Sequence, residues 1–129
     1  MATDQGDDRR CEYAWAAGYY EGDGSITFRP PGKGGISCTL QLSITSVDRE
    51  PLDHFLAVVG FGGIFGPYTR RNVSSGRKPQ FMWRGHRVAN GEALLANLGP
   101  WLSVRRRSQI EDVLTAIAEW PNNAQKEAA

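Results

Sequence analysis

The sequence predicts an α+β domain in which two helix-and-hairpin units follow one another and two further helices close the chain. Small residues recur at helical spacing within residues 9–22, and polar and apolar residues alternate from Cys38 to Thr45. Turns rich in Gly and Pro separate the periodic segments. The chain of 129 residues is long enough to bury a core as one domain.

The first unit is a helix followed by a pair of strands. We expect the helix over residues 9–22, a strand to Arg29 and a turn over residues 30–35. The second strand alternates cleanly, which predicts one buried and one polar face. The buried set is Cys38, Leu40, Leu42 and Ile44, and the polar set is Thr39, Gln41, Ser43 and Thr45.

The second unit and the closing helices follow from similar signals. Asp48 is placed to cap a helix that ends at Gly60, and Pro67 indicates an irregular or edge strand. The segments expected after this helix are strands over 62–68 and 80–84, a turn over 73–78 between them, and helices over 92–98 and 103–120.

Charge is unevenly distributed although the formal net charge is only +1. Residues 1–8 are polar and acidic and are expected to be a flexible leader, and residues 121–129 a flexible tail. The domain between them, residues 9–120, carries two basic clusters, which suits a polyanionic partner. These clusters contain Arg70, Arg71, Arg77, Lys78, Arg84 and Arg87, and Arg105, Arg106 and Arg107.

Composition also constrains the compartment. Two cysteines are too few and too scattered for a disulfide framework or a zinc site. No apolar run reaches the length of a bilayer span, and the first residues do not form a signal sequence. We therefore expect a soluble intracellular protein, in the cytoplasm or an organelle matrix, with no membrane partner.

The end of the first helix is the most informative feature. Ala14, Gly18 and Gly22 lie four residues apart, so on a helix they form one bare stripe along which a second helix can approach closely. Asp23 follows at the end of the helix, where the helix dipole disfavours a carboxylate. Two such helices packed at their stripes would bring two copies of Asp23 together, a concentration of negative charge that attracts a divalent metal.

Residues 16–24, Ala-Ala-Gly-Tyr-Tyr-Glu-Gly-Asp-Gly, resemble the LAGLIDADG motif, and nearly the whole chain resembles a single-motif LAGLIDADG homing endonuclease. The resemblance implies an αββαββα(α) fold with a four-stranded antiparallel saddle sheet. It further implies a homodimer whose central seam is the Ala14, Gly18 and Gly22 stripe. The activity that the resemblance implies is that of an intron-encoded nuclease, which makes a Mg²⁺- or Mn²⁺-dependent double-strand break in a long pseudo-palindromic DNA target.

The resemblance also suggests catalytic residues. Asp23 falls on the final acid of the motif, which binds the metal in the family, and Glu21 falls on the earlier acidic position. Residues 100–105 resemble the stretch that precedes a basic active-site residue, which here is Arg105. After the second strand, where the family often has Gln to orient water, this chain has Ser46. That departure leaves cleavage competence open.

The polar face of the predicted sheet forms a candidate DNA-reading surface, because Arg and Gln contact guanine and adenine edges in the major groove. Basic hairpin tips would contact phosphates. The candidate DNA-binding residues are Thr27, Arg29, Lys33, Thr39, Gln41, Ser43, Arg77, Lys78, Gln80, Arg84 and Arg107.

Two alternatives remain open. One is a cleavage-inactive nucleic-acid-binding protein on the same fold, either a transcriptional regulator or an intron maturase, and only the maturase would have RNA as its partner. The other is an α+β interaction module that does not bind nucleic acid. Double-stranded DNA is the partner that the favoured interpretation predicts.

Overall fold

The computed structural model describes residues 2–69 and 78–120, and of residues 2–5 only the backbone. The helices are α1 (Ala2–Asp23), α2 (Arg49–Val59), α3 (Val88–Leu98) and α4 (Val104–Ala118), with a 3-10 turn, η1 (Gly99–Trp101), before the last. The strands are β1 (Gly24–Arg29), β2 (Thr39–Ser46), β3 (Gly63–Tyr68) and β4 (Gln80–Gly85). The α+β class and the αββαββα(α) order predicted from the sequence are confirmed.

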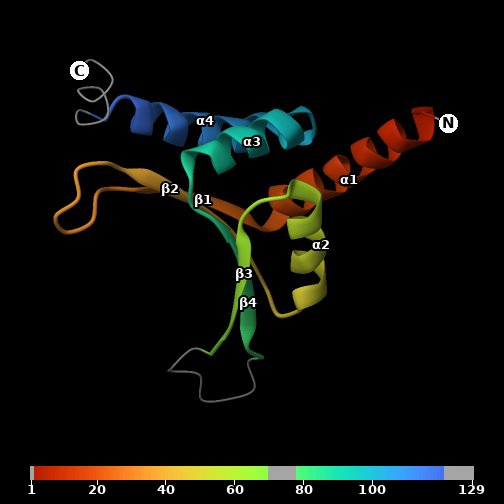
Figure 1. The fold of residues 1–129 in the computed structure, drawn as a ribbon, viewed down its shortest axis with the longest axis horizontal. Coiled ribbons are helices and arrows are strands. Elements are labelled where there is room, and N and C mark those ends of the chain that lie inside the picture. Colours follow the sequence, from red (N-terminus) through yellow and green to blue (C-terminus); the bar gives the residue numbers. More distant parts are fainter. Residues whose placement is uncertain (1, 70–77, 121–129) are drawn as a thin grey trace.

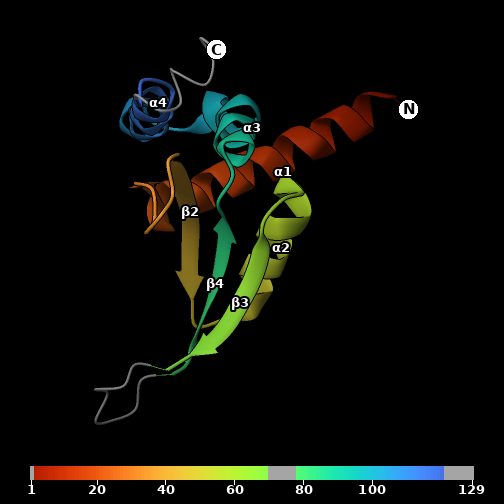
Figure 2. The same ribbon diagram turned by 60° about the vertical axis from the view of Figure 1, so that its left-hand side comes forward.

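The four strands form one antiparallel sheet in the order β1-β2-β4-β3. The sheet bends strongly, so that the β1–β2 hairpin and the β3–β4 hairpin point in different directions (Figure 1). All four α-helices cover one side of this sheet, and its other side carries no helix (Figures 1 and 2). The sheet therefore has one face for the core and one open face.

Strand alternation explains which face is which. Leu40, Leu42 and Ile44 of β2 are buried, while the intervening residues remain half-exposed, as the sequence predicts. On β4, Trp83 is fully buried, and its indole N–H donates to the backbone carbonyl of Phe61 over 3.1 Å. That hydrogen bond satisfies the one polar atom that burial of the ring takes away from water.

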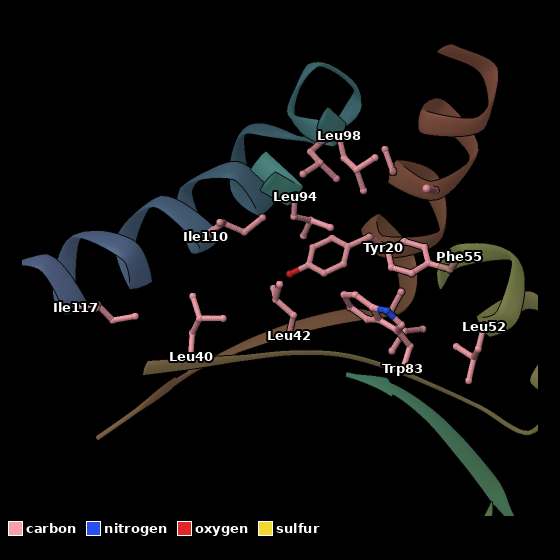
Figure 3. Close-up of a cluster of buried hydrophobic side chains, with 14 of the residues drawn as sticks. Tyr20, Leu40, Leu42, Leu52, Phe55, Trp83, Leu94, Leu98, Ile110 and Ile117 are labelled. Atoms are coloured by element: carbon pink, nitrogen blue, oxygen red, sulfur yellow. The ribbon is translucent and has the colours of Figure 1, made fainter. Parts of the chain in front are cut away.

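The core lies between the sheet and the helices (Figure 3). The C-terminal half of helix α1 contributes Ala16, Ala17 and Tyr20, all fully buried. Phe55 of α2 packs edge-on against Trp83, with ring centroids 4.7 Å apart. Helices α3 and α4 contribute four further aliphatic residues, Leu94, Leu98, Ile110 and Ile117.

Two helices begin earlier than the sequence predicted. Helix α1 begins at Ala2, so residues 2–8, expected to be a flexible leader, are helical. This segment has no proline and a single glycine, so nothing in it ends a helix. Helix α3 begins at Val88 and not at Glu92. It includes Gly91, which is buried against β2. A Cβ at Gly91 would lie 3.0 Å from the Leu40 side chain.

Some predicted segments lie outside the described residues, namely most of the 73–78 turn and the 121–129 tail. Among the helices that are described, none is long and apolar enough to cross a membrane.

Candidate active site and nucleic-acid interface

Asp23 lies at the junction between α1 and β1, as the last residue of the helix. Its side chain is exposed and has no hydrogen bond or ion pair with any residue that the structure describes. The next residue, Gly24, is buried, and a Cβ there would lie 2.2 Å from the ring of Tyr20. The chain therefore turns tightly over Tyr20, and Asp23 is left on the surface with a free carboxylate.

The small-residue stripe of α1 is uncovered within a single chain. Gly18 and Gly22 are exposed, and a Cβ added to either would meet no atom within 4 Å. Ala14 is half-buried. Since Ala17 and Tyr20 turn into the core, α1 has one face packed in its own chain and another face that is bare.

Ser46 ends β2, and Tyr19 of α1 interacts with both Ser46 and Asp23. The Ser46 hydroxyl oxygen accepts a 3.0 Å hydrogen bond from the backbone N–H of Asp48. Burial raises the pKa of Tyr19, its hydrogen bond with Ser46 acts in the opposite direction, and the negative charges of Asp23 and Asp48 raise it further. Sequence reasoning did not select Tyr19, which sits in the motif as an apparently apolar position.

Glu21, unlike Asp23, is hydrogen-bonded within the chain. Its two carboxylate oxygens accept hydrogen bonds from the backbone N–H and the hydroxyl of Ser103, each 2.8 Å long. These two bonds, followed by the positive charges of Arg106 and Arg105, lower the pKa of Glu21. Ser103 is the N-cap of α4, so Glu21 joins the end of α1 to the start of α4.

The basic cluster that starts α4 divides into inward and outward side chains. Arg106 donates to the Glu21 backbone carbonyl over 3.1 Å and lies over the Tyr20 ring, 5.6 Å from its centroid. Arg105, the predicted catalytic cation, is exposed. Its charge acts on Glu21, two residues before Asp23, so the predicted acid and the predicted cation lie at adjoining helix ends.

One chain does not provide a complete metal site within the described residues, because no three Asp, Glu, His or Cys side chains gather there. Asp23 offers a single free carboxylate, and hard divalent cations need several oxygen ligands. The donor set therefore fits Mg²⁺ or Mn²⁺ only if a second copy of Asp23 and waters complete it.

The open face of the sheet is polar and positively charged. None of the four strands contains Asp or Glu, and they carry two arginines, Arg29 of β1 and Arg84 of β4. Strand pairing sets Thr27 opposite Gln41 and Ser43 opposite Arg84, so the predicted side chains from β1, β2 and β4 share this face. Arg29 donates a hydrogen bond to the Gln41 side chain across the first pair of strands.

Two aromatic residues that sequence reasoning missed hold Arg84 in place. Its guanidinium lies 4.4 Å from the centroid of the Phe65 ring and donates to the Tyr68 hydroxyl over 3.4 Å. Both aromatic residues come from β3, where Phe65 pairs with Met82 and Tyr68 with Gln80. Contact with a ring restricts the arginine, so less entropy is lost when it binds a partner.

The remaining candidates are more dispersed. Thr39 is half-buried, and its hydroxyl donates to the His86 carbonyl. Lys33 and Lys78 are exposed beside the strands, in the two hairpin connections. Arg107 is half-buried in the first turn of α4, on the helical side, so the structure does not bring it to the open face. Arg77 lies outside the described residues.

Comparison with known proteins gives a consistent answer at the level of fold. The homing endonuclease I-CvuI, solved with its target in the presence of Ca, matches with a TM-score of 0.69 and 19% identity over 91% of this chain and 72% of that one. The chain has the LAGLIDADG homing endonuclease fold. The archaeal intron-encoded homing endonuclease I-Vdi141I, complexed with DNA, matches with a TM-score of 0.63 and 16% identity over 83% of this chain and 69% of that one.

The LAGLIDADG meganuclease I-AabMI, bound to uncleaved DNA, also matches this chain, with a TM-score of 0.62 and 20% identity. The match covers 91% of this chain but 40% of that one. No protein-family model and no curated protein matches the sequence. The predicted LAGLIDADG fold, with its four-stranded antiparallel sheet, is therefore confirmed by similarity of structure. Similarity of sequence does not contribute to this result.

Proposed function

We propose that the protein is a homodimeric, sequence-specific DNA endonuclease that makes a Mg²⁺-dependent double-strand break in a long pseudo-palindromic target. One observation carries the proposal: Asp23 is a free, exposed carboxylate that ends a helix whose glycine stripe is uncovered. A second copy of the chain packed on that stripe would bring two such carboxylates together. The two-fold axis of the dimer then requires two related half-sites in the DNA.

Asp23 of both chains would hold the metal, which when bound supplies an activated water and neutralises charge at the scissile phosphate. Arg105 is always protonated and exposed at the adjoining helix end, so it would stabilise negative charge on the phosphate but not act as a base. Ser46, held by Asp48 and Tyr19, would orient a water molecule. Glu21 would keep the two helix ends in place.

Base recognition would belong to the open face of the sheet. The arginines there are paired with Gln41 or with the aromatic residues of β3, and none has an acidic partner among the described residues. A hydrogen-bonding surface of this kind, without negative charge, suits the edges of bases in the major groove.

The test is a selection of bound duplexes from randomised DNA in Ca²⁺, followed by transfer to Mg²⁺, with Asp23→Asn as the comparison. We expect a two-fold related site that the wild-type protein cuts on both strands and that Asp23→Asn binds but does not cut. Failure to enrich any DNA sequence would contradict the proposal.

A binding protein without cleavage activity, either a transcriptional regulator or an RNA maturase, is the second candidate. It is favoured by Ser46, whose short side chain already serves Asp48 and Tyr19 and replaces the Gln often found in the family. In the same experiment this candidate predicts a DNA site that the wild-type protein binds and leaves intact in Mg²⁺. Enrichment of structured RNA in place of DNA would favour the maturase.

A further inference from the structure

A pocket of about 380 Å³ opens beside the edge strand β3, where β4 leads into α3. Gly62 and Gly63 line it with their backbone. The side chains that line it are Phe61, Phe65, Arg84, His86, Arg87 and Asn90. Of these, only Arg84 belongs to the candidate DNA-reading surface described above.

The lining is rich in cationic and N–H donor groups and lacks acids. Arg87 and His86 are exposed, and within residues 2–69 and 78–120 neither side chain has a hydrogen bond or an ion pair. Helix α3 begins directly after Arg87 and has no acidic residue in its first turn. The positive charge at this pocket is thus not balanced by the described part of the chain, which favours an anionic ligand.

The pocket is built on closely packed backbone. Gly62 has φ +87°, and a Cβ there would lie 2.6 Å from the Arg84 carbonyl oxygen. Asn90, which also lines the pocket, packs closely on the end of β4, because a Cβ at Gly85 would lie 3.1 Å from its amide nitrogen. The absence of side chains at these glycines lets the backbone segments beside the pocket pack closely.

Arg84 connects the pocket to the open face of the sheet, because its guanidinium lies over the Phe65 ring, which also lines the pocket. We propose that this pocket binds a backbone phosphate of the duplex that lies on the open face, with Arg87 and His86 as its donors. The proposal rests on the proposed DNA binding. A contact of this kind fixes the position of the duplex and does not read its sequence.

The test measures the dissociation constant for a labelled duplex of random sequence between 50 and 200 mM KCl, roughly the range over which phosphate contacts dominate the salt dependence. Arg87→Ala should reduce the slope of log Kd against log [KCl] by about one, since each neutralised phosphate contributes about 0.9. Arg87→Lys keeps the charge and should restore the slope. Arg49→Ala is the matched control.

Arg49 is a suitable control because it also stands at the start of an eleven-residue helix, α2, but lies on the helical side of the sheet. Its removal changes the net charge by the same amount as removal of Arg87, and the slope should not change. Equal slopes for the wild-type protein, Arg87→Ala and Arg49→Ala would overturn the inference and leave DNA binding intact. An equal decrease of the slope in Arg87→Ala and Arg49→Ala would overturn the inference as well.

Two further outcomes separate this inference from the function on which it rests. If the wild-type protein binds no duplex DNA, both proposals fail. A small phosphate ligand is tested by titrating inorganic phosphate and following the amide NMR signals of Gly62, Gly63 and Asn90. Saturable shifts there, together with an unchanged salt slope in Arg87→Ala, would assign the pocket to a free anion and overturn the DNA contact.

Discussion

The Glu21 carboxylate accepts two hydrogen bonds from Ser103, which lies 82 residues away in the sequence. One bond comes from the backbone N–H and the other from the hydroxyl, so both oxygens of the carboxylate are occupied. The pairing joins the last turn of α1, which carries Asp23, to the N-cap of α4, which precedes Arg105. The two acids of the motif therefore have separate tasks, one structural and one proposed to be catalytic.

The coupling between Glu21 and Ser103 should be measurable in a double-mutant cycle. Glu21→Ala, Ser103→Ala and the double variant should give a coupling free energy of about 1 kcal/mol in urea unfolding, because the side-chain bond exists only when both residues are present. Cleavage by Glu21→Ala should fall about tenfold or more, since the Asp23 end of α1 loses its anchor.

Glu12→Ala is the control for this cycle, because Glu12 is an exposed glutamate on the same helix. It should change the free energy of unfolding by less than about 0.5 kcal/mol. Strictly additive effects of Glu21→Ala and Ser103→Ala would show that the pairing does not stabilise the fold.

Tyr20 predicts how stability depends on alkaline pH. Its hydroxyl is buried without a hydrogen-bond partner in the described structure and points into the apolar cluster (Figure 3). Burial raises the pKa of Tyr20 from 10.0 to about 12. Because the folded-state pKa lies above the unfolded value, the stabilisation is complete below pH 10.0 and is lost as the pH rises from there toward about 12.

Tyr20→Phe removes this titration. Near pH 7 the variant should be as stable as the wild-type protein or up to about 1 kcal/mol more stable, because an unpaired buried hydroxyl is removed. As the pH rises to 11, its advantage should grow by about 1.4 kcal/mol, the equivalent of one pKa unit. Urea unfolding from pH 7 to 11 measures the difference in free energy of unfolding between Tyr20→Phe and the wild-type protein. The other tyrosines are common to both proteins and cancel in this difference. A difference that does not change with pH would contradict the raised pKa of Tyr20.

How much could be predicted from the sequence depended on whether an interaction was local. The alternation of β2 was predictable because one face of that strand is buried and side chains alternate with period two. Phe65 and Tyr68 were missed because glycines interrupt the pattern of β3 and its register shifts between these two residues. The pairing of Glu21 with Ser103 was not predictable, since no local pattern reports a contact between two helix ends.

Gly24 should be intolerant of any side chain. A Cβ at this position would lie 2.2 Å from the Tyr20 ring, and that ring is fully buried among the core residues. Gly24→Ala should therefore lower the free energy of unfolding by about 2–3 kcal/mol. Gly32→Ala is the control, because a Cβ at Gly32 meets no atom within 4 Å. A similar urea midpoint for both variants would contradict the tight junction.

Gly18 should matter for association and not for folding. A side chain at Gly18 meets nothing within its own chain, so Gly18→Leu should keep the circular dichroism spectrum of the wild-type protein. It would occupy the space that the α1 helix of a second copy needs for close approach. We expect the dimer dissociation constant, measured by sedimentation equilibrium, to rise at least about tenfold, a loss of about 1.4 kcal/mol.

Gly6→Leu makes the same substitution on the same helix, at another position where a Cβ meets no atom within 4 Å. Gly6 is twelve residues before Gly18 in the sequence, so at about 1.5 Å per residue it lies about 18 Å away along the helix, more than three turns from Gly18. Gly6→Leu should therefore leave the dimer intact. If Gly18→Leu and Gly6→Leu dimerise equally well, the stripe is not the seam, and two copies of Asp23 do not meet through it. If only Gly18→Leu becomes monomeric, its loss of DNA cleavage should match its loss of dimer, because each half of the proposed site then lacks the other acid.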